Sequence, residues 1–381
     1  MDKTLHIFLI VSFLCGSQAT EEWEELHEQT SPHGHDKSPS VRYSHASIVY
    51  KDEMIVTHGY FYDRANGSPA WRDDTWAYSL QAPHEWRQIV SFGGSAESKA
   101  PHGRYGHAVA IVDNKLYLHG GTDGGTRIHG QKGFQTAMEF DDLWRLDLDT
   151  AEWENLKPEG YPRGPLGGTG KRYLHTAVAL GKEIYFYGGS NQSDVWTWNT
   201  EKSFWRQVIP KPGQLWPGRR QGHSAAALPD GPDGKSFVVY AGTRWGFGER
   251  ALLDDIWRFK ADGHVWEQIL PVSSNNPAPR LYHSISTFGD GRMVLMGGST
   301  NSPGMVCQDD TWVFSMQTKE WEQLNTAPAA IYHHTIVADD KTEAAYLFGG
   351  HRCGADRPES PAYLNAVFKL KIPPPLHSEL R

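Results

Sequence analysis

Short apolar runs alternate with polar turns along most of the chain, and the alternation recurs six times. In each copy an apolar run is followed by a short polar turn, such as 51–53 or 289–291, and then by a second apolar run that ends in glycine. The second runs end at His58-Gly59, Gly120-Gly121, Gly188-Gly189, Ala241-Gly242, Gly297-Gly298 and Gly349-Gly350. The runs are short, rich in Val, Ile, Tyr and Trp, and lack a helical period, which indicates β-strands.

Polar and aromatic residues mark fixed places in each copy. Arg-x-x-His opens five copies, at Arg42/His45, Arg104/His107, Arg172/His175, Arg220/His223 and Arg280/His283, and the sixth copy reads Ala330/His333. Asp-x-Trp follows at Asp74/Trp76, Asp142/Trp144, Asp194/Trp196, Asp255/Trp257 and Asp310/Trp312, where the sixth copy has Ala366/Phe368. A second Trp follows at Trp86, Trp153, Trp205, Trp266 and Trp321. Each copy therefore predicts four short strands, and six such units predict a β-propeller with tryptophans packed between its blades.

This pattern resembles the kelch repeat in its double glycine, its later aromatic pair and its Arg-x-x-His opening. The resemblance implies an all-β, six-bladed kelch β-propeller with repeats at 42–90, 104–157, 172–209, 220–270, 280–325 and 330–372. The sixth repeat lacks a fourth-strand segment, but residues 22–26 (EWEEL) are similar to the fourth strand at 320–324 (EWEQL). We therefore expect the N-terminal segment 20–41 to supply the outer strand that closes the ring, and 373–381 to form a polar tail.

The first nineteen residues follow a different pattern. Lys3 precedes a short apolar core at 7–15, and Ser17 and Ala19 fit the small-residue positions of a cleavage site. Residues 1–19 therefore predict a secretory signal peptide and a secreted, extracellular protein. The apolar core is shorter than the roughly 18 residues of a membrane-spanning helix, so no membrane span is expected.

Composition narrows the expected chemistry. The formal net charge is −8 and no long basic run occurs, which argues against a nucleic-acid partner. Loss of the leader would leave Cys307 and Cys353, and an oxidising compartment favours a disulfide between them. Sequons at Asn66 and Asn191 predict N-glycosylation in a eukaryotic secretory pathway. We expect a monomer without a cofactor.

Strand direction predicts which face binds. The first strand of each copy starts, and the second and fourth strands end, at one face, so the longer loops gather there; we call it the loop face. Varied loops on a rigid scaffold commonly form binding sites, and Trp and Arg are frequent hot-spot residues. The ligand-face candidates are Trp71, Arg127, Trp216, Arg244, Trp245, Glu249, Arg250 and Arg352. Packing of these loops against themselves is the alternative for each of them.

The five opening arginines allow two interpretations. Arg42, Arg104, Arg172, Arg220 and Arg280 share the loop-face edge of their blades with the aspartates of Asp-x-Trp. The sixth copy lacks both residues, which suggests Arg–Asp pairing, because a buried charge is unstable without its partner. The resemblance implies an alternative: in some kelch propellers arginines at this position contact acidic peptides, and here they would ring the channel mouth. The repeated histidines occupy a scaffold position, so no metal site is expected.

The sequence contains no nucleophile elbow, phosphate loop or metalloprotease motif. We therefore expect a non-enzymatic module that binds an extracellular protein, with an acidic partner as one option. The alternative is a carbohydrate-binding or sugar-isomerising propeller, because secreted mutarotases resemble this fold and Glu249 beside Arg250 offers an acid–base group. An intracellular adaptor would require that 1–19 is not a leader. A deep funnel would favour a small molecule, and a wide face rimmed by Trp and Arg would favour a protein.

Overall fold

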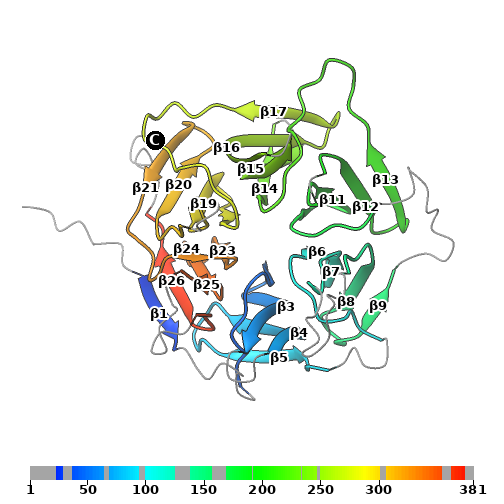
Figure 1. Ribbon diagram of the computed structural model, residues 1–381, viewed down its shortest axis with the longest axis vertical. Coiled ribbons are helices and arrows are strands. Elements are labelled where there is room, and N and C mark those ends of the chain that lie inside the picture. Colours follow the sequence, from blue (N-terminus) through cyan, green and yellow to red (C-terminus); the bar gives the residue numbers. More distant parts are fainter. Residues whose placement is uncertain are drawn as a thin grey trace, which may run out of the picture.

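The computed structural model describes residues 23–28, 37–63, 68–93, 99–124, 138–156, 169–190, 192–232, 234–246, 249–300, 306–353 and 362–373. These residues form six four-stranded antiparallel sheets arranged around one axis as the blades of a propeller (Figure 1). The predicted all-β, six-bladed fold is therefore confirmed. The predicted leader lies outside the described residues, and within them no helix is long and apolar enough to cross a membrane.

The strands of each blade run in chain order from the axis to the rim. Blade one contains β2 (Ala46–Tyr50), β3 (Glu53–Asp63), β4 (Ser68–Ser79) and β5 (Trp86–Val90). Blade two contains β6 (Ala108–Val112), β7 (Lys115–His119), β8 (Leu143–Asp147) and β9 (Trp153–Asn155). Blade three contains β10 (Thr176–Leu180), β11 (Glu183–Tyr187), β12 (Val195–Asn199) and β13 (Phe204–Val208).

The second half of the ring repeats this order until its last blade. Blade four contains β14 (Ser224–Gly231), β15 (Gly234–Gly246), β16 (Glu249–Lys260) and β17 (Val265–Ile269). Blade five contains β18 (Ser284–Thr287), β19 (Arg292–Met296), β20 (Thr311–Ser315) and β21 (Glu320–Gln323). Blade six contains β23 (Thr335–Asp339), β24 (Ala344–Phe348), β26 (Val367–Lys371) and β1 (Trp23–His27), and a short ribbon of β22 (Ile331–Tyr332) and β25 (His351–Arg352) lies on its loop-face side.

The hydrophobic core lies between neighbouring blades. In one cluster Tyr187 of blade three packs with Phe259 and Trp266 of blade four, and the other described clusters join blades in the same way. Trp266 and Trp321, two of the predicted packing tryptophans, are buried. A single blade has two apolar faces, so each blade needs both neighbours for stability.

The N-terminal strand closes the ring, as predicted. β1 pairs with β26 in blade six, from Trp23 opposite Leu370 to His27 opposite Val367. Trp23 packs against the cluster between blades five and six, and Leu26 packs against the cluster between blades six and one. One short strand thus covers the open edge of β26 and adds apolar contacts to both sides of its blade.

Removal of the closing strand is expected to destabilise the propeller. Deletion of residues 20–28 uncovers the edge of β26 and removes two partly buried apolar side chains, so the melting temperature should fall by about 10 °C. Thermal unfolding followed by circular dichroism measures the change. Glu24→Gln, at an exposed position of the same strand, is the control and should melt like the wild type. An unchanged melting curve after the deletion would contradict the closing role of β1.

Six backbone hydrogen bonds form a closed ring around the axis, at the loop-face end of the inner strands. The bonds run from N–H to O=C as Ser44→His333, Gly106→Ser44, Leu174→Gly106, Gly222→Leu174, Tyr282→Gly222 and His333→Tyr282, at 2.7–3.0 Å. All six residues have positive φ, between 50 and 65°. We call them the neck ring. It links each blade to the next and narrows the central channel.

The neck ring shows that the predicted opening of the sixth repeat is wrong by one residue. His333 occupies the neck-ring position, so His334 is the counterpart of the repeated histidines and Ile331 is the counterpart of the arginines. The glycines agree with this register: a Cβ on Gly350 would lie 2.7 Å from the Cβ of His334. Two adjacent histidines made the pattern ambiguous in the one repeat that has no arginine.

Candidate functional site

The five arginines are buried and each is paired within its own blade. The pairs are Arg42–Asp74, Arg104–Asp142, Arg172–Asp194, Arg220–Asp255 and Arg280–Asp310, with N···O distances of 2.6–3.2 Å and arginine side chains 0–2% exposed. Each aspartate also accepts a hydrogen bond from Nε1 of the tryptophan two residues later, at 2.6–2.8 Å. None of the five arginines therefore presents its guanidinium group at the channel mouth.

Charge and hydrogen bonds lower the pKa of Asp74, Asp142 and Asp255. Burial raises the pKa of Asp74, but the charge of Arg42 and hydrogen bonds from Arg42 and Trp76 outweigh burial and hold the pKa below its usual value. The arginines also donate to the carbonyl oxygens at the ends of the second strands, as Arg280 does to Gly297 at 2.9 Å. The Arg–Asp pairs thus join the first, second and third strands of their blades.

Blade six replaces this polar group with apolar side chains. Ile331 stands in the place of the arginine, Ala366 in that of the aspartate and Phe368 in that of the tryptophan. All three lie in one buried hydrophobic cluster. Blade six therefore lacks both charges of the pair. It also lacks the indole N–H that would need a carboxylate as its acceptor, because phenylalanine has no such group.

Two long hairpins rise from the loop face on opposite sides of the ring (Figure 1). In blade one β3 and β4 continue past the glycine bulge to pair Tyr60 with Trp71, and in blade four β15 and β16 continue in the same way to pair Trp245 with Arg250. We call these extensions arm one and arm four. The longer segments expected to form loops at this face therefore include paired strands in blades one and four, where residues 60–63 pair with 68–71 and residues 243–246 pair with 249–252.

A continuous path of ring contacts joins the two arms across the channel mouth. From arm one, Trp71 contacts Tyr60 at 5.8 Å between ring centroids, and Tyr60 contacts Tyr43 at 5.3 Å. Tyr43 contacts His333 at 5.7 Å, and His333 stacks on Tyr282 at 3.8 Å.

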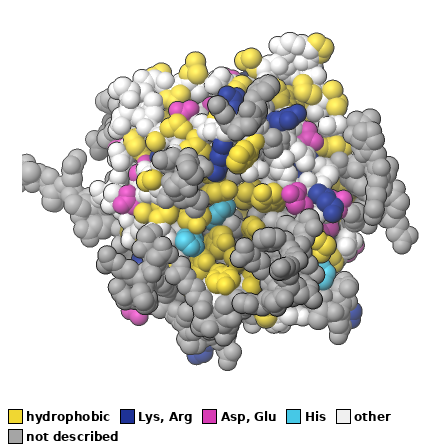
Figure 2. Space-filling model, viewed as in Figure 1, with side chains coloured by type: hydrophobic (Ala, Val, Ile, Leu, Met, Phe, Trp, Pro, Cys, Tyr) yellow, Lys and Arg dark blue, Asp and Glu magenta, His cyan; other side chains and the backbone are white. Residues whose placement is uncertain are grey.

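On arm four, Arg250 lies beside the Tyr282 hydroxyl and its guanidinium lies 5.6 Å from the ring of Trp245. We call these seven residues the aromatic track: Trp71, Tyr60, Tyr43, His333, Tyr282, Arg250 and Trp245. Figure 2 shows hydrophobic and histidine side chains gathered around the middle of the face in view, with basic side chains beside them.

The tyrosines of the track remain protonated at neutral pH. Burial and the neighbouring Tyr363 raise the pKa of Tyr60 to about 12. Burial also raises the pKa of Tyr282, although the charge of Arg250 opposes the increase. Their hydroxyl groups are therefore neutral, and the track combines apolar ring faces with hydrogen-bonding groups.

The channel beneath the track is narrow. A cavity of about 100 Å³ lies at the neck ring, lined by its six residues and by the repeated histidines. A second cavity, of about 170 Å³, lies further along the axis between the inner strands. Both are smaller than the ~300–1,000 Å³ of ordinary ligand pockets. Neither of these two cavities is large enough to enclose an ordinary ligand.

The repeated histidines are neutral parts of the scaffold. Burial first, and then the charge of Arg42, lower the pKa of His45 well below its usual value, and its Nε2 lies 2.8 Å from the Thr335 hydroxyl of the preceding blade. His223 and Thr176 make the corresponding contact between blades four and three at 3.1 Å. Within the described part of the chain, no group of three or more His, Cys, Asp or Glu side chains could hold a metal ion.

The remaining candidates take different positions. Trp216 packs against Trp266 and donates to the Ser193 carbonyl at 2.6 Å, so its ring faces inward. Arg244 is exposed on arm four, and Arg352 lies in the ribbon strand β25. Other candidates can be placed only in part: Glu249 is paired with Gly246 through its backbone, whereas Arg127, Asn66 and Asn191 lie outside the described residues.

Four track residues were missing from the sequence-based candidates: Tyr43, Tyr60, Tyr282 and His333. Tyr43 and Tyr282 occupy the variable positions of Arg-x-x-His, next to the residues that defined the repeat. An aromatic residue at a variable position of Arg-x-x-His could have identified Tyr43 and Tyr282 as candidates. This position lies at the channel mouth in every blade, because the same segment forms the neck ring.

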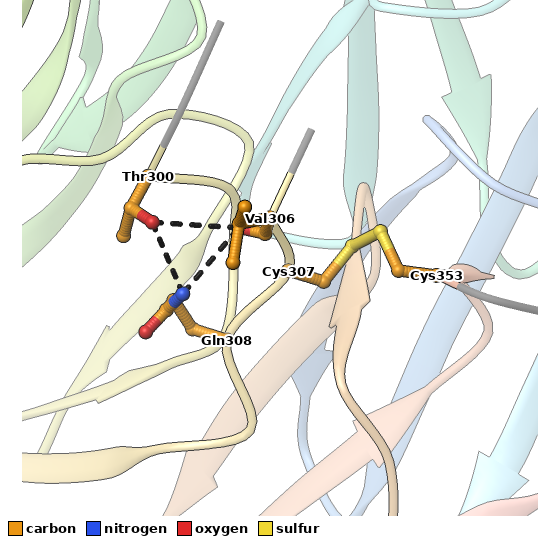
Figure 3. The surroundings of a disulfide bond; sticks show 5 residues. All are labelled: Thr300, Val306, Cys307, Gln308 and Cys353. Atoms are coloured by element: carbon orange, nitrogen blue, oxygen red, sulfur yellow. Dashed lines mark hydrogen bonds between the residues drawn. A yellow bond between two sulfur atoms is a disulfide. The ribbon is translucent and has the colours of Figure 1, made fainter. Parts of the chain in front are cut away.

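A disulfide joins the loops of blades five and six, between Cys307 and Cys353 (Figure 3). Hydrogen bonds among Thr300, Val306 and Gln308 support the blade-five side. On the other side Cys353 directly follows β25, whose His351 lies 5.9 Å from Tyr43 of the track. The disulfide therefore anchors the loop-face segments that flank the track at blade six.

Removal of this disulfide is expected to lower stability. The bond closes a sequence separation of 46 residues, and its loss should reduce the free energy of unfolding by about 2–4 kcal/mol, since the unfolded chain gains freedom. Urea unfolding of a Cys307→Ser/Cys353→Ser variant measures the effect. Reducing agent should destabilise the wild type by a similar amount and leave the variant unchanged. Equal stability of variant and oxidised wild type would show that the bond contributes nothing.

The sequence resembles known kelch proteins. The model for the "KLHDC2/KLHL20/DRC7 Kelch-repeats domain" matches residues 11–189, 100–298 and 174–373. Kelch domain-containing protein 10 of Homo sapiens is 28% identical over 219 residues, which cover 54% of this chain and 42% of that protein. Kelch domain-containing protein 1 of Homo sapiens is 25% identical over 341 residues, covering 82% and 76%.

The match to kelch domain-containing protein 10 thus spans less than half of that relative's length. Among solved structures, one titled "Structure of YjhT" superposes with a TM-score of 0.60 at 14% identity, covering 87% of this chain and 96% of that one. At that identity the structural match supports the fold alone.

Proposed function

This chain belongs to the kelch-repeat family, and we propose that it is a secreted module that binds an extracellular protein on its loop face. Kelch propellers serve as protein-binding modules in general. The specific proposal concerns the location of the site and the compartment. The aromatic track between arm one and arm four is the binding surface, and residues 1–19 direct the chain into the secretory pathway.

One observation carries this proposal. Half-buried aromatic side chains from blades one, five and six form an uninterrupted surface that ends at each side in an arm bearing Trp and Arg. The floor of this surface is the neck ring, and the cavity there is only about 100 Å³. A broad surface of Trp, Tyr and Arg without a deep pocket is typical of protein interfaces. The sugar-isomerising alternative needs an enclosing pocket, which this geometry does not favour.

Affinity capture from extracellular fluid tests the site. The mature propeller is the bait, and a Trp245→Ala/Arg250→Ala variant removes the end of the track on arm four. The control is Phe204→Ala/Arg87→Ala, which removes an exposed aromatic and an exposed basic side chain from outer strands. We expect a protein that wild type and control retain and the arm-four variant loses. Equal capture by all three baits would argue against the track.

Secretion needs a separate experiment. Expression of the full chain in cells with a secretory pathway should place the protein in the medium, shortened at its N-terminus by residues 1–19. The same chain without this segment should stay in the cells. Retention of the full chain, or secretion with residues 1–19 still attached, would contradict the proposed leader.

A further inference from the structure

We infer that the aromatic track binds an extended, proline-rich segment with an acidic residue at the end that meets arm four. The inference rests on the proposed function, because it assigns the chemistry of the partner at the same surface. Three features carry it: the shape of the track, the chemistry of its side chains and the position of its basic group.

The shape of the track favours an extended chain. Its contacts run from Trp71 through Tyr43 to Trp245 by way of blades one, six, five and four, and the neck ring closes the space below. The two arms stand at the ends of this path on opposite blades (Figure 1). A ligand that contacts both ends must therefore span the channel mouth, and an extended segment is long enough to do so.

The side chains favour proline within that segment. The track presents Tyr, Trp and His rings together with neutral hydroxyl groups. Polyproline II segments offer flat apolar rings, and their carbonyl groups have no internal partners, so tyrosine rings and hydroxyls can satisfy both. Such a segment is ordered before binding, so it loses little conformational freedom on a surface without deep pockets.

Charge sets the direction of the segment. Arg250 lies at the arm-four end, where it donates to the Thr243 hydroxyl at 3.2 Å and stacks beside Trp245, and Arg244 is exposed on the same arm. On arm one, Arg72 lies among Asp63, Asp73 and Asp74, whose charges offset its own. The pairing of Trp245 with Arg250 places both side chains on one face of arm four, whereas Arg244 lies on the other face. Arg250 is thus the basic group at this end of the track, and an acidic residue of the ligand complements it.

Direct binding of synthetic peptides tests this inference. The probe is a fluorescein-labelled peptide of eight prolines preceded by two aspartates, and the matched peptide replaces the prolines by alternating glycine and serine. By fluorescence anisotropy we expect the proline peptide to bind at least tenfold more tightly, which corresponds to about 1.4 kcal/mol. Replacement of its aspartates by asparagines should weaken binding to the wild type and have no effect on an Arg250→Ala variant.

Matched variants connect the binding to the track. Trp245→Ala and Tyr43→Leu should each lower the affinity for the proline peptide at least tenfold. Leucine is used at position 43 because Tyr43 is half-buried and leucine preserves apolar volume there. Phe204→Ala, a similarly exposed aromatic position on β13, should bind like the wild type. Melting curves establish that each variant is folded.

The inference and the proposed function fail in different ways. Equal affinity for both peptides, absence of proline-peptide binding by the folded wild type, or an effect of Phe204→Ala as large as that of Trp245→Ala would overturn the inference. If the affinity capture still yields a protein that wild type retains and the arm-four variant loses, the partner binds through a folded surface. If the affinity capture also shows no difference between the baits, the proposed function is overturned.

Discussion

Replacement of Asp310 by alanine should lower the free energy of unfolding by about 3–5 kcal/mol. Its carboxylate binds Arg280 at 2.6 and 2.7 Å and accepts the Trp312 Nε1–H at 2.7 Å. The Arg280 side chain is 0% exposed, so the variant would leave a buried guanidinium without its counter-charge and a buried indole N–H without its acceptor. Urea unfolding followed by circular dichroism measures the loss.

Blade six suggests a variant that distinguishes two effects on stability: leaving a buried charge without its partner, and removing the whole polar group. It carries Ile331, Ala366 and Phe368 at the positions of these three residues, and all three are buried. The triple variant Arg280→Ile/Asp310→Ala/Trp312→Phe gives blade five the same side chains and leaves no buried charge. It should recover most of the stability that Asp310→Ala loses, since a hydrophobic set of similar volume can replace a buried ion pair.

The control removes a charge pair at the surface. Lys182→Ala breaks the pair with Asp113, whose partners are both solvent-exposed, and should leave the unfolding midpoint nearly unchanged. A triple variant no more stable than Asp310→Ala would show that the Arg–Asp pair itself, and not the burial of an unpaired charge, governs the stability of the blade.

The sequence predicted the propeller because its scaffold imposes local steric rules. A Cβ on Gly59 would lie 2.8 Å from the Cβ of His45, and Gly59 has a φ of 105°, so glycine is required where the second strand passes the histidine. The corresponding glycines of the other blades approach their histidines about as closely, so the same residues recur in each repeat and make the repeat visible in the sequence. The closing strand was predictable for the same reason, because β1 keeps the residue pattern of the other outer strands.

The aromatic track could not be predicted in this way. Tyr43, Tyr282 and His333 come from three blades and touch only because the neck ring brings their backbones together. No spacing within one repeat reports such a contact. The arginines failed as surface candidates for a related reason: a repeated charge shows that a position matters, but its burial follows from the partner that folding places beside it, here Asp74 for Arg42.

We expect acid to destabilise this protein already below pH 6.5, where histidines titrate, and not only near pH 4, where carboxylates titrate. Eight histidines have pKa values below the usual value of 6.5, mainly because burial disfavours their charged form: His45, His58, His107, His175, His223, His283, His334 and the half-buried His333. For His333 and His334 the pKa falls to about 3.

The direction of the effect follows from proton binding. Below pH 6.5 these histidines bind more protons in the unfolded chain than in the folded one, so unfolding takes up protons and stability falls as pH decreases. A histidine that stays neutral in the folded chain costs about 1.4 kcal/mol of stability for each pH unit below 6.5. Several such histidines together reach a large fraction of the stability of an ordinary domain. The propeller should therefore be stable above pH 7 and melt at a sharply lower temperature between pH 6.5 and 5.

Calorimetric melting from pH 7.5 to 4.5, in buffers of different ionisation enthalpy, counts the protons taken up on unfolding. We expect at least four near pH 5.5, because so many imidazoles are held neutral by the fold. Uptake of fewer than two would mean that water reaches the buried rings and that the histidines titrate normally. Titration of Asp142 gives a separate, lower window. Arg104 keeps the pKa of Asp142 below 3.8 despite burial, so the Arg104–Asp142 pair loses stability only as pH falls below that value. His283→Gln should remove about one proton from the upper window and none from the lower one, which ties the acid sensitivity to the imidazoles that line the neck ring.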